Sequence, residues 1–166
     1  MIKPNYILII ILSGFLILTN SCKKYPEDPF YSLRSSEKRL TGKWIITKIV
    51  KDGSDITSQY NDTLYPYAYD SFVFYFKFDD PDRHPKADVS VNNNTIFNMG
   101  FGIDPKLSSM GMYPPNESPI ISDTTAYEKL TRLLFYRWKV RELYRKDLHL
   151  TSYYDSYELF FTKIAK

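Results

Sequence analysis

The chain has 166 residues, of which 43% are hydrophobic and 25% are charged. This composition is that of a folded domain and excludes an intrinsically disordered chain. The formal net charge of +3 is too small for a general polyanion-binding surface, which excludes nucleic acid as the expected partner. A single cysteine excludes an internal disulfide and a cysteine-based zinc site.

The first 21 residues have the features of an export signal. Lys3 supplies a positive charge, and the following segment Tyr6–Leu18 is apolar, interrupted only by Ser13 and Gly14. A helix needs roughly 20 apolar residues to cross a bilayer, so this segment is short for a permanent span. Its length is that of a signal-peptide core.

Residues 18–22, Leu-Thr-Asn-Ser-Cys, resemble the lipobox of bacterial lipoproteins, with Thr19 where leucine is usual. The resemblance implies that the signal peptide 1–21 is removed and that Cys22 is acylated. Each buried methylene of an acyl chain contributes about 0.8 kcal/mol, so several chains would hold the protein at a membrane. A cleaved secretory signal without lipid and an uncleaved short anchor are the alternatives.

The segment 22–39 reads as a tether between the lipid and a domain that spans residues 40–166. It contains two prolines and many charged residues, with little apolar periodicity. We expect a lipid-anchored protein of the cell envelope, in the outer membrane. The two lysines after Cys22 precede the acidic pair Glu27 and Asp28, and this order leaves open whether the domain faces the periplasm or the cell surface.

Strands are expected to dominate the domain, since several segments alternate between apolar and other positions. In Ser71–Phe78 all four phenylalanines share one face. In Lys43–Lys51 the same rule places Val50 on the face of Trp44 and places Ile49 on the opposite face.

Further strands are predicted at Ala87–Val91, Thr95–Ile103, Tyr136–Glu142, Leu148–Leu150 and Tyr157–Ile164. The asparagines between the first two of these segments tolerate left-handed backbone and predict a turn. Helical spacing of leucines predicts one short helix over 125–134, and the prolines of 104–123 predict a long loop. The expected fold is all-β and mainly antiparallel, a small barrel or half-barrel of about seven or eight strands with one short helix.

Gly42-Lys43-Trp44 resembles the G-x-W motif that opens the first strand of lipocalins. The pattern from Trp138 to Phe160 resembles the last strands of small lipocalin-like lipoproteins of Bacteroidota, and the tether is similar to their leaders. The resemblance implies a lipocalin-like barrel in which Trp44 lies at a closed end, beneath a basic residue of the last strand. Lys163 is the basic residue available for that role.

Six aromatic residues have two interpretations. In an open barrel they would line a pocket for a small apolar ligand, whereas in a closed barrel they would fill the core. They are Trp44, Phe74, Phe97, Phe101, Trp138 and Phe161.

Two loop features are weaker candidates. Tyr60, Tyr65, Tyr67 and Tyr69 crowd one loop around Pro66, and exposed rings of this kind either stack on sugars or cover a barrel end. The tripeptides that contain Thr63 and Thr124 resemble acceptors for O-glycosylation in exported Bacteroidota proteins.

No motif of a known catalytic site is present, so we expect no enzyme and no catalytic residues. His149 lies between Leu148 and Leu150, and alternation points it towards solvent. The acidic segment Asp79–Asp88 is interrupted by prolines and is expected to be a solvated loop, not a metal site.

We expect a monomer without cofactors that binds a small apolar ligand. The alternative is an interaction module that contacts an envelope protein or glycan, and a cryptic hydrolase is a third alternative.

Overall fold

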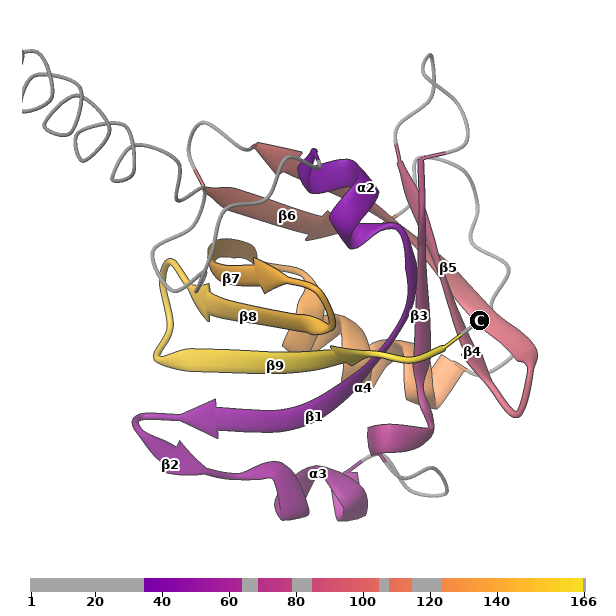
Figure 1. Ribbon diagram of the computed structural model, residues 1–166. Coiled ribbons are helices and arrows are strands. Elements are labelled where there is room, and N and C mark those ends of the chain that lie inside the picture. Colours follow the sequence, from indigo (N-terminus) through magenta and orange to yellow (C-terminus); the bar gives the residue numbers. More distant parts are fainter. Residues whose placement is uncertain (1–34, 64–68, 79–84, 105–107, 115–123, 166) are drawn as a thin grey trace, which may run out of the picture.

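The computed structural model describes residues 35–63, 69–78, 85–104, 108–114 and 124–165. These residues form an antiparallel barrel (Figure 1). The strands are β1 (Gly42–Lys51), β2 (Ser54–Asp55), β3 (Val73–Lys77), β4 (Lys86–Val91), β5 (Asn94–Asp104), β6 (Ser109–Tyr113), β7 (Arg137–Tyr144), β8 (Asp147–Ser152) and β9 (Tyr157–Lys163). The helices are α2 (Ser36–Leu40), α3 (Thr57–Thr63), the short η1 (Tyr69–Ser71) and α4 (Thr124–Leu134).

The sheet is closed, because β1 pairs with β3 along one edge and with β9 along the other. The order β1-β3-β4-β5-β6-β7-β8-β9 makes an eight-stranded barrel in which successive strands are neighbours, and β2 is an extra strand beside the end of β1. The prediction of a mainly antiparallel all-β barrel is confirmed, and the half-barrel alternative is excluded.

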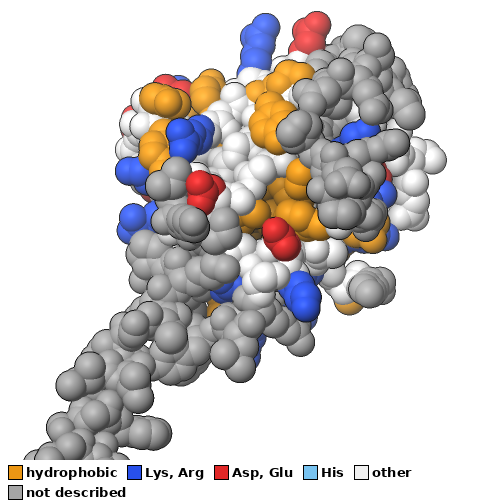
Figure 2. Space-filling model, turned by 90° about the horizontal axis from the view of Figure 1, so that it is seen from above, with side chains coloured by type: hydrophobic (Ala, Val, Ile, Leu, Met, Phe, Trp, Pro, Cys, Tyr) orange, Lys and Arg blue, Asp and Glu red, His pale blue; other side chains and the backbone are white. Residues whose placement is uncertain are grey.

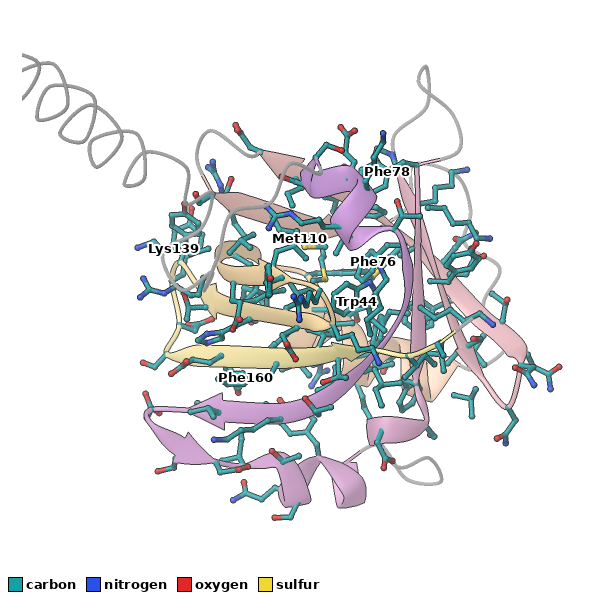
Figure 3. All side chains as sticks on the ribbon, in the orientation of Figure 1. Trp44, Phe76, Phe78, Met110, Lys139 and Phe160 are labelled. Atoms are coloured by element: carbon teal, nitrogen blue, oxygen red, sulfur yellow. The ribbon has the colours of Figure 1, made fainter. Side chains whose placement is uncertain are left out.

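Alternation along the strands fills the barrel interior with apolar side chains, as expected for inward and outward positions. In β3 and β4 every second residue is buried. Figure 3 shows Trp44, Phe76 and Met110 pointing into the barrel, whereas Phe160 and Lys139 point outwards.

One inward position was predicted wrongly. Ile49 is fully buried and belongs to the core, whereas Val50 lies outside the core cluster. The cause is a bulge in β1, where the pairing with β9 shifts between Ile46 and Lys48. A bulge inserts one extra residue and therefore reverses the face of every residue after it.

Five elements lie outside the predicted set, including the short β2 and η1. Strand β6 falls within the predicted long loop; only two methionines alternate there around a glycine, so its signal is weak. Helix α2 occupies the end of the predicted tether, where the side chain of Ser35 accepts a hydrogen bond from the backbone N–H of Lys38 and caps the helix. Helix α3 is built from polar residues without an apolar stripe.

Two local predictions are confirmed. Helix α4 coincides with the predicted helix, and its leucines Leu130, Leu133 and Leu134 join the core. Asn92 and Asn93 have φ angles of 52° and 65°, the left-handed values that a tight turn between β4 and β5 requires.

The barrel has two distinct ends. Helix α2 precedes β1 at the end where β7 and β9 finish, and we call this the α2 end. Helix α4 connects β6 to β7 at the opposite end, the α4 end, where α3 and the turn between β8 and β9 also lie. Because β1 runs ten residues from the first end to the second, the path between the two ends along this strand is about 30 Å.

Candidate functional site

The six aromatic residues proposed to line a pocket all lie together in one hydrophobic core. Their exposed fraction is 0% for five of them and 2% for Phe161. The rings of Phe74 and Phe161 meet edge to face with centroids 5.6 Å apart, and those of Phe76 and Phe101 do so at 4.9 Å. A side chain that lines a ligand chamber keeps surface that water can reach, and these side chains have almost none. Their arrangement is that of a packed interior.

The α2 end is closed by hydrogen bonds around Trp44. Its indole N–H donates to the carbonyl oxygen of Leu40 at 2.6 Å, and the Lys163 ammonium lies 5.2 Å from the centroid of the indole ring system. Lys163 also donates to the carbonyl oxygen of Arg39 at 2.8 Å, and the guanidinium of Arg39 donates to the carbonyl oxygen of Leu143. The arrangement expected from the G-x-W resemblance, a basic residue of the last strand over Trp44, is therefore present.

Gly42 makes this closure sterically feasible. Its φ angle is 130°, and a Cβ atom there would lie 2.7 Å from Cε of Lys163. Any larger residue would displace the lysine from the indole ring, so the glycine of the motif has a packing role.

The α4 end carries a group of tyrosines, and one of them, Tyr60, belongs to the loop tyrosines that were expected either to stack on sugars or to cover a barrel end. Tyr60 of α3 is half-buried against the core near Tyr157 and Tyr136. Burial raises the pKa of Tyr60, and its hydrogen bond with Tyr157 raises it further. A hydrogen bond with Tyr157 also raises the pKa of Lys51. These contacts fix α3 over the barrel end, which is a structural role.

A groove of about 420 Å³ lies on the outside of the barrel, beside the α2 end. Its lining is mainly apolar and combines backbone, a tyrosine ring and two lysine side chains. The lining residues are Thr41, Gly42, Lys43, Tyr75, Lys163 and Ile164. Lys163 is already engaged by Trp44 and Arg39, so the groove offers Lys43 as its exposed cation.

His149 was predicted to face solvent, and this prediction is wrong. The residue does point away from the core, but only 9% of its surface is exposed. The Phe160 ring stacks on the imidazole with centroids 4.1 Å apart, and Nε2 lies 2.8 Å from a carboxylate oxygen of Glu158. Side chains of the neighbouring strand cover the imidazole on the outer face, and alternation alone does not reveal such a contact.

The described part of the chain contains no group of three or more histidine, cysteine, aspartate or glutamate side chains that could hold a metal ion. Asp88, which falls in both the predicted acidic loop and the predicted strand Ala87–Val91, lies in β4 and pairs with Lys77 of β3. Asp88 is part of a strand and not of a loop, because Ala87 and Val89 on either side of it are buried in the alternating pattern of β4. Within the described residues, no helix combines the length and apolar character needed to cross a membrane.

Several candidates fall outside the described residues. These are Cys22, Tyr65 and Tyr67. The structure places Tyr69 in η1, Thr63 at the last position of α3 and Thr124 at the first position of α4, without describing their side chains. The two threonines were expected in loops, and that expectation is wrong because the backbone at both positions is helical.

The large hydrophobic side chains that are exposed in the described residues are Tyr75, Tyr153 and Tyr154. The last two occupy the turn between β8 and β9, which the sequence pattern did not single out. The feature of the sequence that could have identified this site is the pair of adjacent tyrosines in a predicted turn.

The sequence matches no protein-family model, and no curated protein is significantly similar to it. Among solved structures, the chain is similar to a DUF4847 family protein from Bacteroides vulgatus, with 16% sequence identity and a TM-score of 0.49. The alignment covers 79% of this chain and 98% of that protein. At this identity the likeness gives no information about activity or ligands.

Proposed function

We propose that this protein is a lipid-anchored component of the bacterial cell envelope that works as a non-enzymatic interaction module. The barrel is a packed scaffold, and its outer surface contacts an envelope partner. The observation that carries the proposal is the burial of the six interior aromatic residues, which leaves the interior of the described barrel without the exposed lining that a bound ligand needs.

The anchor is inferred from the sequence around Cys22. The only cysteine is separated by three residues from the end of an apolar segment of signal-peptide length. Acylation there would leave a linker of 13 residues between the lipid and the start of α2 at Ser36. Fully extended, such a linker reaches about 45 Å, so the barrel would stay close to the membrane surface.

The packed interior favours this module over the ligand carrier suggested by the resemblance to lipocalins. A Phe or Leu side chain that is fully buried contributes about 1.5–3 kcal/mol to stability, and emptying the barrel would forfeit several such contributions. A hydrolase is less well supported, since the His149–Glu158 pair, whose imidazole is largely covered, lies on the outer face and outside the groove described above.

Intact mass analysis of the full-length protein, isolated in detergent from a native or lipoprotein-processing host, tests the anchor. The expected mass lacks residues 1–21 and includes acyl chains on Cys22, and the Cys22→Ala variant should remain unprocessed. A chain that retains Met1, or one with an unmodified Cys22, would contradict the proposal.

Native mass spectrometry of the same preparation tests the packed barrel. Apart from detergent, we expect the mass of the acylated protein alone. Copurification of a stoichiometric small apolar molecule would favour the ligand carrier instead.

A further inference from the structure

The turn between β8 and β9 presents two tyrosines on a rigid base. The Ser152 hydroxyl accepts hydrogen bonds from the backbone N–H groups of Tyr154 at 3.2 Å and Asp155 at 3.1 Å. The backbone N–H of Tyr153 donates to the carbonyl oxygen of Arg137 at 3.1 Å. The turn is thus tied to β7, and its shape does not depend on a partner.

Both rings are accessible. Tyr154 is 78% exposed and Tyr153 is 37% exposed. Their centroids lie 6.4 Å apart with the ring planes tilted by 46°. Keeping a ring this exposed forgoes the stability that burial would contribute, and the two rings together form a platform of the size of a short saccharide.

Two cations adjoin the same platform. The guanidinium carbon of Arg137 lies 5.3 Å from the centroid of the Tyr153 ring, and the ammonium of Lys139 lies 5.0 Å from it. Both side chains are exposed, and neither forms an ion pair with a carboxylate of the described residues. Figure 2 shows Lys and Arg side chains among hydrophobic ones along the left margin of the molecule, the side on which Figure 3 places Lys139.

The turn carries one acidic residue, Asp155. It adds a minor contribution to the raised pKa of Lys51, whose main cause is the hydrogen bond with Tyr157. The end of β1 adjoins the turn through the hydrogen bond from the Asp52 N–H to the Ser156 carbonyl oxygen, whereas Arg137 and Lys139 lie on the opposite flank, on β7.

We propose that the surface formed by Arg137, Lys139, Tyr153 and Tyr154, the tyrosine platform, binds an acidic saccharide. The inference rests on the proposed function and names the partner class of the module. A sugar ring presents a C–H face that stacks on Tyr154, and its carboxylate forms charge-assisted hydrogen bonds with Lys139 and Arg137. These groups match the two kinds of surface that a uronic acid exposes.

The position of the tyrosine platform favours a saccharide over the lipid surface of the anchoring membrane. The chain enters the barrel from its N-terminal side at the α2 end, next to Gly42, whereas the platform lies at the α4 end, about 30 Å away along β1. The lipid at Cys22 would be attached through the linker at the α2 end, so the anchor itself would leave the tyrosine platform uncovered.

Calorimetric titration of the full-length acylated protein in phosphatidylcholine nanodiscs tests the proposal. The probes are tetragalacturonate, which is acidic, and maltotetraose, which is neutral and has the same number of rings. We expect tetragalacturonate to bind about tenfold more tightly than maltotetraose, since carboxylates add charge-assisted contacts. Its binding should also weaken as salt is raised.

The variants locate the site. Tyr154→Ala removes an exposed ring, and R137Q/K139Q removes both charges, and we expect each to weaken tetragalacturonate binding about tenfold. Tyr75→Ala is the matched control, because Tyr75 is also 37% exposed with a lysine 4.6 Å from its ring centroid. That lysine, Lys77, pairs with Asp88, so the control should bind like the wild type.

Any one of three results would overturn the proposal. These are unchanged binding in both platform variants, absence of tetragalacturonate binding, and equal binding of both probes. A membrane role is distinguished by hydrogen exchange. Protection of the backbone amides from Tyr153 to Ser156 in phosphatidylglycerol nanodiscs, without any saccharide binding, would assign the platform to lipid and overturn it as well. Acylation of Cys22 is read from the mass of the same preparation, so an acylated protein that fails to bind overturns this inference alone.

Discussion

Trp44 stabilises the junction between the first strand and α2 through two contacts that depend on its indole. The N–H donates to Leu40, and the face of the ring system adjoins the Lys163 ammonium. Phenylalanine keeps the apolar volume in part but cannot donate a hydrogen bond. We predict that Trp44→Phe lowers the free energy of unfolding by about 2–3 kcal/mol, since it leaves a buried carbonyl without a donor and creates a small void.

Urea unfolding monitored by far-ultraviolet circular dichroism measures this change. Tyr154→Phe is the control, because its ring is exposed and its substitution should alter stability by less than about 0.5 kcal/mol. Equal stability of Trp44→Phe and the wild type would show that the junction does not depend on the indole N–H.

At the scale of single residues, the sequence predicted the interior better than the outer face. The six interior aromatic residues were placed correctly because alternation determines which side of a strand faces inwards. His149 was placed on the correct face but in the wrong environment. Its cover comes from Phe160 and Glu158 on the paired strand, and the register of that pairing is not readable from one sequence.

On the outer surface of β5 and β6, glycines leave space for a tyrosine ring that packs directly on the backbone. The Tyr113 ring lies across Gly100, Gly102 and Gly111, and a Cβ atom at Gly100 would lie 2.4 Å from the ring. We predict that Gly100→Ala costs about 1–2 kcal/mol of stability by lifting the ring. Gly102→Ala is the control, since its Cβ would meet only the Tyr113 hydroxyl at 3.5 Å.

Two measurements distinguish ring displacement from a general backbone effect. Burial raises the pKa of Tyr113, so lifting the ring into water should lower that pKa towards the ordinary tyrosine value in a nuclear magnetic resonance titration. In addition, combining Gly100→Ala with Tyr113→Ala should cost less than the sum of the single changes. Additive costs with an unchanged pKa would refute the displacement.

Helix α3 begins with a carboxylate cap that makes its stability depend on pH. The hydroxyl and the backbone N–H of Thr57 both donate to Asp55, and these hydrogen bonds lower the pKa of Asp55 below its usual value of 3.8. A lowered pKa contributes stability that is fully present above the unfolded value and is lost as pH falls through the folded value. We predict that Asp55→Asn loses this contribution.

The stability difference between the wild type and Asp55→Asn should therefore be constant from about pH 5 to 7 and shrink below about pH 4. Denaturant unfolding across this range provides the measurement. Thr57→Ser retains both donors and should show the pH dependence of the wild type. A difference that grows as pH falls would have the wrong sign for this cap.

The elements that sequence patterns missed are those whose formation depends on distant partners. Strand β6 carries only two buried methionines and exists because β5 and β7 pair with both of its edges. The bulge in β1 is likewise visible only in its pairing with β9. The long alternating segments around β3 and β5, Ser71–Phe78 and Thr95–Ile103, were predicted well, since each contains enough inward positions to define its own face.

At the scale of the whole molecule, closure of the barrel is the feature that the sequence left open. Repeated alternation predicted many antiparallel strands but not whether the first and last of them meet. The structure pairs β1 with β9 over seven positions, from Trp44 with Lys163 to Lys51 with Tyr157. This contact joins residues more than a hundred positions apart. It closes the curved sheet around an interior, which is either filled with side chains or hollow.

Phe74 provides a direct test of which interior the molecule has. In a packed barrel, Phe74→Ala removes a fully buried ring that meets Phe161 edge to face, and we predict a loss of about 3–5 kcal/mol. In a hollow barrel the same change would only enlarge an existing space and cost far less.

Phe160→Ala on the outer face is the control, with a smaller expected loss of stability. The Phe160 ring is partly exposed, and among the described aromatic rings it packs on His149 alone. If Phe74→Ala does not fold, Phe74→Leu serves in its place, with an expected loss of about 1 kcal/mol. Comparable small losses for Phe74→Ala and Phe160→Ala would mean that the interior can accept a ligand.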